Sequence, residues 1–188
     1  SWPAMLRSNT RVFFVESLTN PLLGVAELAE VCRFCKEHGL LAIIDGTLTS
    51  PVNFRPRELG FDLIVHSATK YLGGHSDLTA GALMGRQADL APVWNWRKNL
   101  GTTIAPETAS LLARSLRTLV VRVRAQNAAA QAVAEAMQTH PRVARVYYPG
   151  LPDFPGHALA RAQMHGFGGM LSIDIRGSGT DATQVADR

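Results

Sequence analysis

Short apolar runs alternate with a helical pattern near the start of the chain, and this alternation constrains the fold most. Val12 to Val15 and Leu40 to Ile44 have the length of strands, and the second run is apolar throughout, as in a strand buried on both faces. Between them, apolar residues recur at helical spacing from Val25 to His38, and Gly39 follows as a stop signal. A strand, a helix and a strand within about 35 residues predict a βαβ unit with a parallel sheet.

Two further apolar runs, Leu63 to Val65 and Ala82 to Met84, extend the predicted sheet. The pattern changes at Pro106, which begins a helix, and Thr108 to Gln138 contains neither Gly nor Pro. We therefore predict one helix of about 30 residues there, far longer than the mean and typical of a connection between two domains.

Beyond Pro141 the elements are shorter. The pattern predicts a strand, a short helix, a second strand and the start of a helix at Val143 to Tyr148, Ala158 to Met164, Met170 to Ile175 and Asp181 to Arg188. The first two thirds of the chain are thus expected to be α/β. Because both ends fall beside predicted elements, we also expect a fragment of a longer protein.

Composition excludes several classes of protein. Hydrophobic residues make up 46% and charged residues 18%, which argues against intrinsic disorder. The sequence contains no run of 18 apolar residues, so no membrane span is predicted. The net charge is +4, and the 16 arginines are mostly scattered along the sequence. A continuous basic surface for nucleic-acid binding is therefore not expected. Two cysteines and no signal peptide lead us to expect a reduced, soluble, cytoplasmic protein without nucleic-acid or membrane partners.

Polar side chains follow three of the predicted strands where each strand ends. They are Glu16 and Asn20, then Asp45 and Thr47, then His66, Ser67, Thr69 and Lys70. Carboxyl ends of parallel strands meet at one edge of a sheet, where ligands bind. For each of these residues alone, an ordinary turn or N-cap role is the favoured interpretation. Together they predict a binding site.

The set suits pyridoxal phosphate. A lysine amine such as Lys70 bonds the aldehyde carbon, and burial of the amine would favour its reactive neutral form. A carboxylate such as Asp45 keeps the pyridine nitrogen protonated, which makes the ring an electron sink. Hydroxyls and turn N–H groups hold the phosphate, and Gly73 with Gly74 permits close approach of the backbone.

At this point the motifs become recognisable. Ser67 to Asp77 (SATKYLGGHSD) strongly resembles the cofactor-lysine signature of the cysteine/methionine-metabolism family of pyridoxal-phosphate enzymes, which includes cystathionine γ-synthase, cystathionine γ- and β-lyases, methionine γ-lyase and O-acylhomoserine sulfhydrylases. Further segments resemble the family in order and spacing: Glu16 to Pro21 (ESLTNP), Asp45 to Pro51 (DGTLTSP), Arg114 to Leu119 (RSLRTL) with Arg122, Gln126 and Asn127, Tyr148 to Leu151 and Gly166 to Met170. The resemblance spans essentially the whole chain.

The resemblance implies a fold and roles for single residues. The fold would be aspartate-aminotransferase-like (fold type I), with residues 1–118 as the C-terminal part of the large cofactor-binding domain and residues 119–188 as the beginning of the α+β C-terminal domain. The complete protein would be a homo-oligomer, a dimer of dimers. Lys70 would form the internal imine and move protons, and Asp45 would pair with the pyridinium nitrogen. Ser67 and Thr69 would bind the phosphate, and Asn20 would lie beside the phenolic oxygen. Glu16 and Thr47 would not touch the cofactor directly but would hold these residues in position.

The implied reaction is γ- or β-elimination or γ-replacement on cystathionine, homoserine esters or related sulfur amino acids, and the sequence does not choose among lyase, synthase and sulfhydrylase. Gly46 and Leu18 depart from the family's usual Asn and Pro. Other family elements, including the Gly-containing phosphate loop and the carboxylate-binding arginine, are expected outside this chain. The alternative is a truncated relative with a structural or interaction role.

Other motifs admit simpler interpretations. Ser67-x-x-Lys70 also fits a serine acyl-enzyme motif, but the K-T-G and S-D-N partners are absent. Cys32 and Cys35 are predicted to lie in the middle of a helix, on the apolar face that packs in the protein core, rather than to form a redox or zinc site. Trp94 and Trp96 are expected in an irregular stretch, with packing favoured over an interface role.

Overall fold

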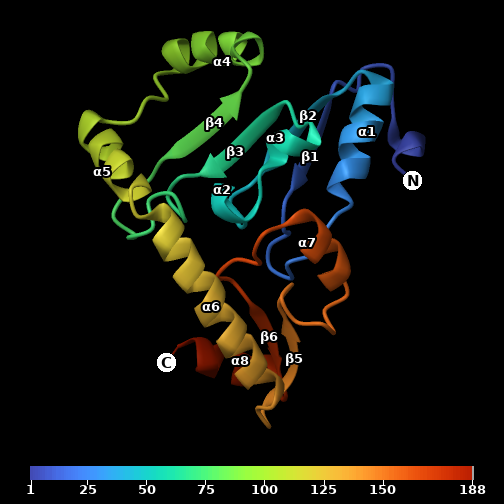
Figure 1. Ribbon diagram of the computed structural model, residues 1–188, viewed down its shortest axis with the longest axis vertical. Helices are drawn as coiled ribbons and strands as arrows, with labels where there is room; N and C mark the ends of the chain where they lie inside the picture. The colour runs from blue at the N-terminus through green and yellow to red at the C-terminus, as the bar shows by residue number, and fades with distance from the viewer. Residues whose placement is uncertain (188) are drawn as a thin grey trace.

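The first four strands form a single sheet. The computed structural model describes residues 1–187, and its larger sheet has the order β1 (Val12–Glu16), β2 (Leu41–Asp45), β3 (Leu63–Ser67) and β4 (Gly81–Gly85). The first three strands are parallel, and β4 is antiparallel to β3. The predicted α/β architecture with a mostly parallel sheet is confirmed (Figure 1).

The central strand β2 is less enclosed than its composition suggests. Ala42 and Ile44 are buried in the main core, whereas Leu41 and Ile43 are half-buried. The prediction of a strand buried on both faces is therefore wrong for this chain: one face of β2 packs fully and the other only in part.

Helix α1 (Leu28–His38) connects β1 to β2 and buries the stripe Leu28, Val31, Phe34 and Cys35. It begins three residues later than the periodicity predicted, and it ends as expected at Gly39, which is left-handed with φ of 63°. A glutamine far along the chain completes its first turn: Gln163 Oε1 accepts a hydrogen bond from Leu28 N (2.8 Å), and Gln163 Nε2 donates one to Ala26 O (3.1 Å). Two short helices, α2 (Ser50–Asn53) and α3 (Pro56–Leu59), then lead to β3.

The stretch that contains the tryptophans is helical. Trp94 and Trp96 lie on α4 (Gln87–Leu100), which follows β4 and buries none of its residues, so the expected irregular stretch is wrong. Both side chains are exposed, by 61% and 65%, so the expected packing is not found. Arg97 stacks on Trp94, with its guanidinium carbon 4.7 Å from the ring centroid.

The predicted single long helix is two helices. α5 (Pro106–Leu116) and α6 (Leu119–Gln138) are separated by Arg117 and Thr118. The Ser115 carbonyl accepts hydrogen bonds from Thr118 N (3.2 Å), Thr118 Oγ1 (3.1 Å) and Arg122 Nη2 (3.0 Å). These bonds occupy the oxygen that a continuous helix would offer to the fourth residue along, so the chain turns there.

The last part of the chain forms a second, smaller sheet. Strands β5 (Val143–Tyr147) and β6 (Ser172–Ile175) are antiparallel, with α7 (His157–Gln163) between them and α8 (Gly179–Ala186) after them. These elements match the prediction within a few residues, except that Arg188 lies outside the described residues. α6 runs from the end of the larger sheet to the smaller one (Figure 1).

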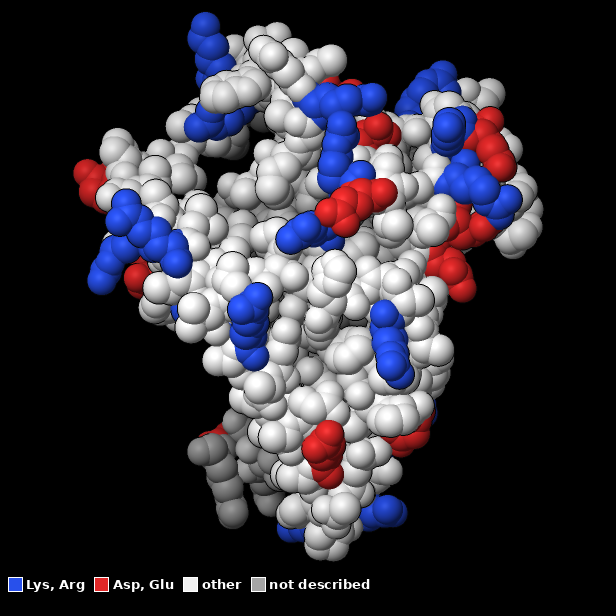
Figure 2. Space-filling view, viewed as in Figure 1, with Lys and Arg blue, Asp and Glu red and all other residues white. Residues whose placement is uncertain are grey.

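Both sheets share one core. Ile44 of β2 and Val146 of β5 belong to the same cluster of buried side chains, as does Tyr148. A division after residue 118 therefore stays a prediction. A 3-10 turn (Pro3–Met5) precedes β1, and none of the helices in residues 1–187 combines the length and apolar character needed to cross a bilayer. On the face drawn in Figure 2, basic side chains are dispersed, with acidic ones among them.

Candidate functional site

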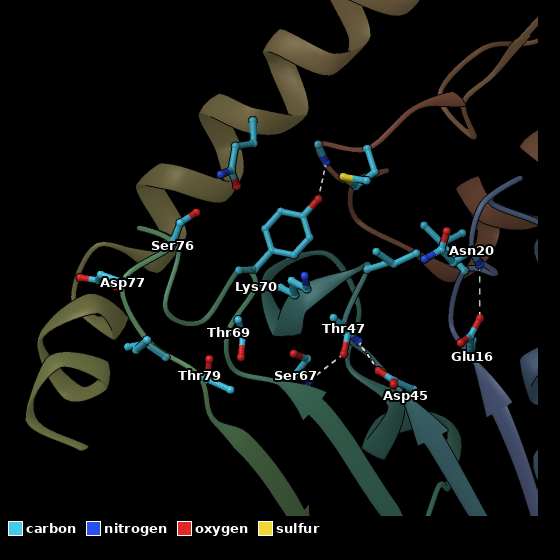
Figure 3. A pocket seen from close by; sticks show the side chains of 18 residues that line it. Glu16, Asn20, Asp45, Thr47, Ser67, Thr69, Lys70, Ser76, Asp77 and Thr79 are labelled. Carbon is cyan, nitrogen blue, oxygen red and sulfur yellow. Dashed lines mark hydrogen bonds between the residues drawn. The ribbon is translucent and has the colours of Figure 1, made fainter. Parts of the chain in front are cut away.

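A cavity of about 990 Å³ lies at the carboxyl ends of β1, β2 and β3. All five residues predicted to bind a cofactor line it, as do the two predicted supporting residues: Asn20, Asp45, Ser67, Thr69, Lys70, Glu16 and Thr47. They come from three strand ends that the parallel register brings side by side. The sequence prediction that strand-end side chains meet at one edge of the sheet is thus confirmed for these seven residues (Figure 3), whereas His66 of the same set is buried and is not among the lining residues.

Lys70 lies in the turn that follows β3. Its backbone N–H donates to Ser67 O (3.1 Å), and its carbonyl accepts from Gly74 N (2.7 Å). The side chain is exposed, so the expected burial of the amine is wrong for this chain. The physical reason is its place: the turn projects from the strand end into the open cavity, where in Figure 3 Lys70 lies above Ser67, beside Thr69 and Thr47.

Asp45, Thr47 and Ser67 are joined by two hydrogen bonds. Thr47 N donates to Asp45 Oδ1 (2.8 Å), and Thr47 Oγ1 accepts from Ser67 N (2.8 Å). Thr47 therefore fixes the end of β2 to the end of β3 and orients the carboxylate. Within residues 1–187, Asp45 Oδ2 has no hydrogen-bond partner, so it is available to a ligand.

The two hydroxyls predicted to bind phosphate differ in their surroundings. Thr69 Oγ1 accepts a hydrogen bond from Ala80 N (3.1 Å) and lies 3.4 Å from Ala80 O. The Ser67 hydroxyl makes no such bond among the described residues. Thr69 is thus held by the residue directly before β4, whereas the Ser67 hydroxyl has no such partner among the described residues.

Asn20 reaches the cavity from the loop after β1. Its backbone N–H donates to Glu16 Oε2 (3.3 Å), so Glu16 supports the loop as predicted. Both residues are exposed at the cavity rim. The Leu18 that replaces the family's proline is buried, with 2% of its surface exposed, and anchors the loop in the core.

The Gly46 that replaces the family's usual Asn lies against His66. A Cβ at Gly46 would come within 2.8 Å of Cε1 and 2.9 Å of Nε2 of His66, closer than van der Waals contact allows. Burial lowers the pKa of His66 below its usual value, and the nearby Asp45 carboxylate opposes this effect. His66 is therefore a neutral ring packed under the turn that positions Asp45.

This burial predicts how stability depends on pH. Below about pH 6.5 the unfolded chain takes up a proton at His66 that the folded chain resists, so the free energy of unfolding should fall as pH drops from 6.5 toward the lower folded-state pKa. We expect His66→Gln to flatten this part of the stability curve, measured by urea denaturation from pH 5 to pH 8. The exposed His165→Gln is the control and should retain the wild-type slope. An equally steep curve for both variants would contradict the prediction.

Several cavity residues were not predicted from the sequence. Tyr71, Ser76, Asp77, Thr79, Gln126 and Met170 also line the cavity. Tyr71 OH accepts a hydrogen bond from Gly169 N (2.6 Å), and burial raises its pKa. The strand pattern gave no reason to expect cavity residues from α6 or from residues 169–170. For Gln126 and Met170, the one available signal was that both lie in segments that resemble the family.

The cysteine pair belongs to the core rather than to a site. Cys35 is buried and Cys32 packs against the same cluster, as predicted. Burial, with the neighbouring Cys35 and Asp62, raises the pKa of Cys32 to about 11, so its thiol stays protonated at neutral pH. Residues 1–187 hold no group of three or more His, Cys, Asp or Glu that could bind a metal ion.

Comparison with known proteins agrees with this geometry. The family model described as "Cys/Met metabolism PLP-dependent enzyme" matches residues 1–188. The chain belongs to this family. The family's cofactor is pyridoxal phosphate, and the resemblance inferred from the motifs is confirmed.

Among its relatives in the family, cystathionine γ-synthase 1 of Arabidopsis thaliana is 46% identical over 88% of the chain and 30% of the relative. A probable cystathionine γ-synthase of Herpetosiphon aurantiacus is 42% identical over 98% of the chain and 58% of the relative. A cystathionine β-lyase of Coxiella burnetii is 39% identical over 96% and 47%. The chain thus spans 30% to 58% of these relatives' lengths.

Solved structures give the same fold. Apo CalE6, a methionine γ-lyase from Micromonospora echinospora, matches with a TM-score of 0.91 and 38% identity over 96% of the chain and 50% of that protein. Cystathionine γ-synthase from Xanthomonas oryzae pv. oryzae, in complex with aminoacrylate and cysteine, matches with 0.89 and 41% over 94% and 46%. The expected aspartate-aminotransferase-like fold is thereby confirmed.

The residues present fit the family's cofactor. The cavity offers one amine, a carboxylate with an oxygen free, and hydroxyls on the turn that holds the amine: Lys70, Asp45, Ser67 and Thr69. These groups match, in kind, an aldehyde, a pyridine nitrogen and a phosphate. With about 990 Å³, the cavity lies at the upper end of the range for small-molecule sites.

Proposed function

We propose that the chain forms the cofactor-lysine side of a pyridoxal-phosphate enzyme of the cystathionine synthase and lyase type. The main support is that Asp45, at the end of β2, and Lys70, in the turn after the neighbouring strand β3, line the same cavity. Relatives named as synthases and lyases for cystathionine support the choice of substrate class. A solved relative is in complex with cystathionine, which suggests that this class of sulfur amino acid suits the fold.

In this proposal each residue has a distinct task. Pyridoxal phosphate, when bound, supplies an aldehyde carbon that bonds amines and a ring that withdraws electrons from the substrate's α carbon. Lys70 Nζ holds the cofactor and then moves the substrate's α proton. Asp45 Oδ2 holds the proton of the ring nitrogen, while Oδ1 stays fixed by Thr47 N.

The remaining residues bind and orient. Ser67 and Thr69 donate hydrogen bonds to the phosphate, and the bond between Thr69 Oγ1 and Ala80 N keeps that side chain in place. Asn20 approaches the ring from the loop that Glu16 supports. The exposure of Lys70 fits an amine that must exchange partners between cofactor and substrate.

The test is turnover by the protein encoded by the complete reading frame, saturated with pyridoxal phosphate. With L-cystathionine and water, γ-elimination gives 2-oxobutyrate, ammonia and cysteine, whereas β-elimination gives pyruvate, ammonia and homocysteine. With an O-acylhomoserine and cysteine, γ-replacement gives cystathionine and the released carboxylic acid, without a keto acid. We expect one of these product sets, which also decides between lyase and synthase. Absence of all three would overturn the proposal and favour the structural or interaction role.

A further inference from the structure

Arg122 on α6 binds the turn that contains Lys70. Its Nη1 donates to Tyr71 O (2.9 Å), and its Nη2 lies 3.5 Å from Leu72 O. These carbonyls belong to the two residues directly after Lys70. A guanidinium gives charge-assisted hydrogen bonds in a rigid planar fork, so Arg122 restrains the backbone of the turn rather than a side chain.

The turn is shaped to receive this guanidinium. Gly74 has φ of 73°, and a Cβ there would overlap Nη1 and the central carbon of Arg122. A residue with a side chain at position 74 would displace the guanidinium. It would also be strained, because the backbone there is left-handed. Gly74 thus provides the space through which Arg122 reaches the carbonyl of Tyr71.

The other side of Arg122 is fixed at the break between α5 and α6. Nε donates to Thr118 Oγ1 (3.0 Å), and Nη2 donates to Ser115 O (3.0 Å). This Ser115 oxygen is the one that also accepts from Thr118 at the end of α5. The break that interrupts the predicted long helix therefore creates one half of the Arg122 site, and the Lys70 turn supplies the other half.

A second tie joins the same turn to the C-terminal part of the chain. Tyr71 OH accepts from Gly169 N (2.6 Å), across the cavity wall. The residue after Lys70 is thus held through its carbonyl by α6 and through its hydroxyl by the segment before β6. Lys70 itself is exposed, and its position depends on this backbone rather than on packing of its side chain.

We propose that Arg122 is a positioning residue that fixes Lys70 Nζ relative to the bound cofactor and the substrate's α carbon. This inference rests on the proposed function, in which Lys70 holds the cofactor and moves a proton. Proton transfer needs the donor and acceptor within about 3 Å, and a displacement of about 1 Å can cost about 100-fold in rate. A turn freed from Arg122 would allow such displacement while leaving the sheet and its core intact.

The experiment compares Arg122→Met and Arg122→Lys with Arg124→Met in the full-length protein loaded with pyridoxal phosphate. Lysine keeps the charge but cannot bind the carbonyls on both sides at once, and Arg124 is an exposed neighbour on the same helix. Three quantities are measured: the pH midpoint and visible circular dichroism of the lysine-bound cofactor, kcat and KM separately, and Tm.

For both Arg122 variants we expect a shifted pH midpoint, weakened visible dichroism and a kcat lower by about 100-fold with little change in KM. Arg124→Met should match the wild type. If the methionine variant does not fold, the lysine variant decides. A lowered Tm with unchanged chromophore and kcat would show a merely structural role and overturn the inference.

The two proposals fail in different ways. If wild-type protein forms no visible band with the cofactor, the proposed function fails and this inference with it. If the wild-type band forms and turnover is seen, but the Arg122 variants keep the wild-type midpoint and kcat, only the inference fails.

Discussion

Lys70→Ala should abolish the visible absorbance that the wild-type protein shows with pyridoxal phosphate. The loss follows because, among residues 1–187, Lys70 is the one lysine that lines the cavity, and the variant would offer no lysine amine there to bond the aldehyde. We expect kcat to fall by about 10,000-fold, the upper end of what removal of a general base costs. The measurements are an absorbance spectrum and steady-state turnover on the same samples.

Lys98→Ala is the matched control, because Lys98 is exposed on α4 and lies outside the lining of the cavity. It should retain both band and turnover. A visible band that survives in Lys70→Ala and disappears in Lys98→Ala would show that the cofactor bonds another amine, and the proposed site would be wrong.

Asp45→Asn is expected to give the second-largest loss. The amide is nearly the same size, and its oxygen can still accept from Thr47 N as Oδ1 does at 2.8 Å, so the turn should keep its shape. It has no charge to hold a proton on the ring nitrogen. We therefore expect kcat to fall by about 100- to 1,000-fold, as when one preorganised electrostatic contact is removed, with Tm close to the wild type.

Asp153→Asn serves as its control. Asp153 is exposed and accepts hydrogen bonds from Gln138 Nε2 at 3.1 Å, which asparagine can still accept through its oxygen. Steady-state kinetics and thermal melts on both variants separate the effects. Equal kcat for Asp45→Asn and the wild type would remove the carboxylate from the proposed mechanism.

The sequence predicted the site better than it predicted exposure. Strand-end residues such as Asp45 and Lys70 could be placed together because parallel register alone determines that they share an edge. Whether Lys70 is buried depends on which segments surround the turn, and no local pattern encodes that. Thr47 was predicted only as a supporting residue, and its two hydrogen bonds define that support.

The helix predictions show the same limit. Periodicity located α5 and α6, but the break at Thr118 results from side-chain bonds to the Ser115 carbonyl, in a segment with no Gly or Pro to mark it. The tryptophans of α4 were expected to pack because large aromatic residues usually do. Their helix has no buried residue among those described.

The two hydrogen bonds of Gln163 have a consequence for the order of assembly. Leu28 N and Ala26 O depend on a residue more than 130 positions later, and unpaired groups at a helix start are otherwise left to water. During synthesis, α1 can thus form its body early, but its first turn can be completed only after residue 163 has left the ribosome. Contacts so distant along the chain form slowly, so we expect the first turn of α1 to reach its native hydrogen bonding later than the rest of that helix.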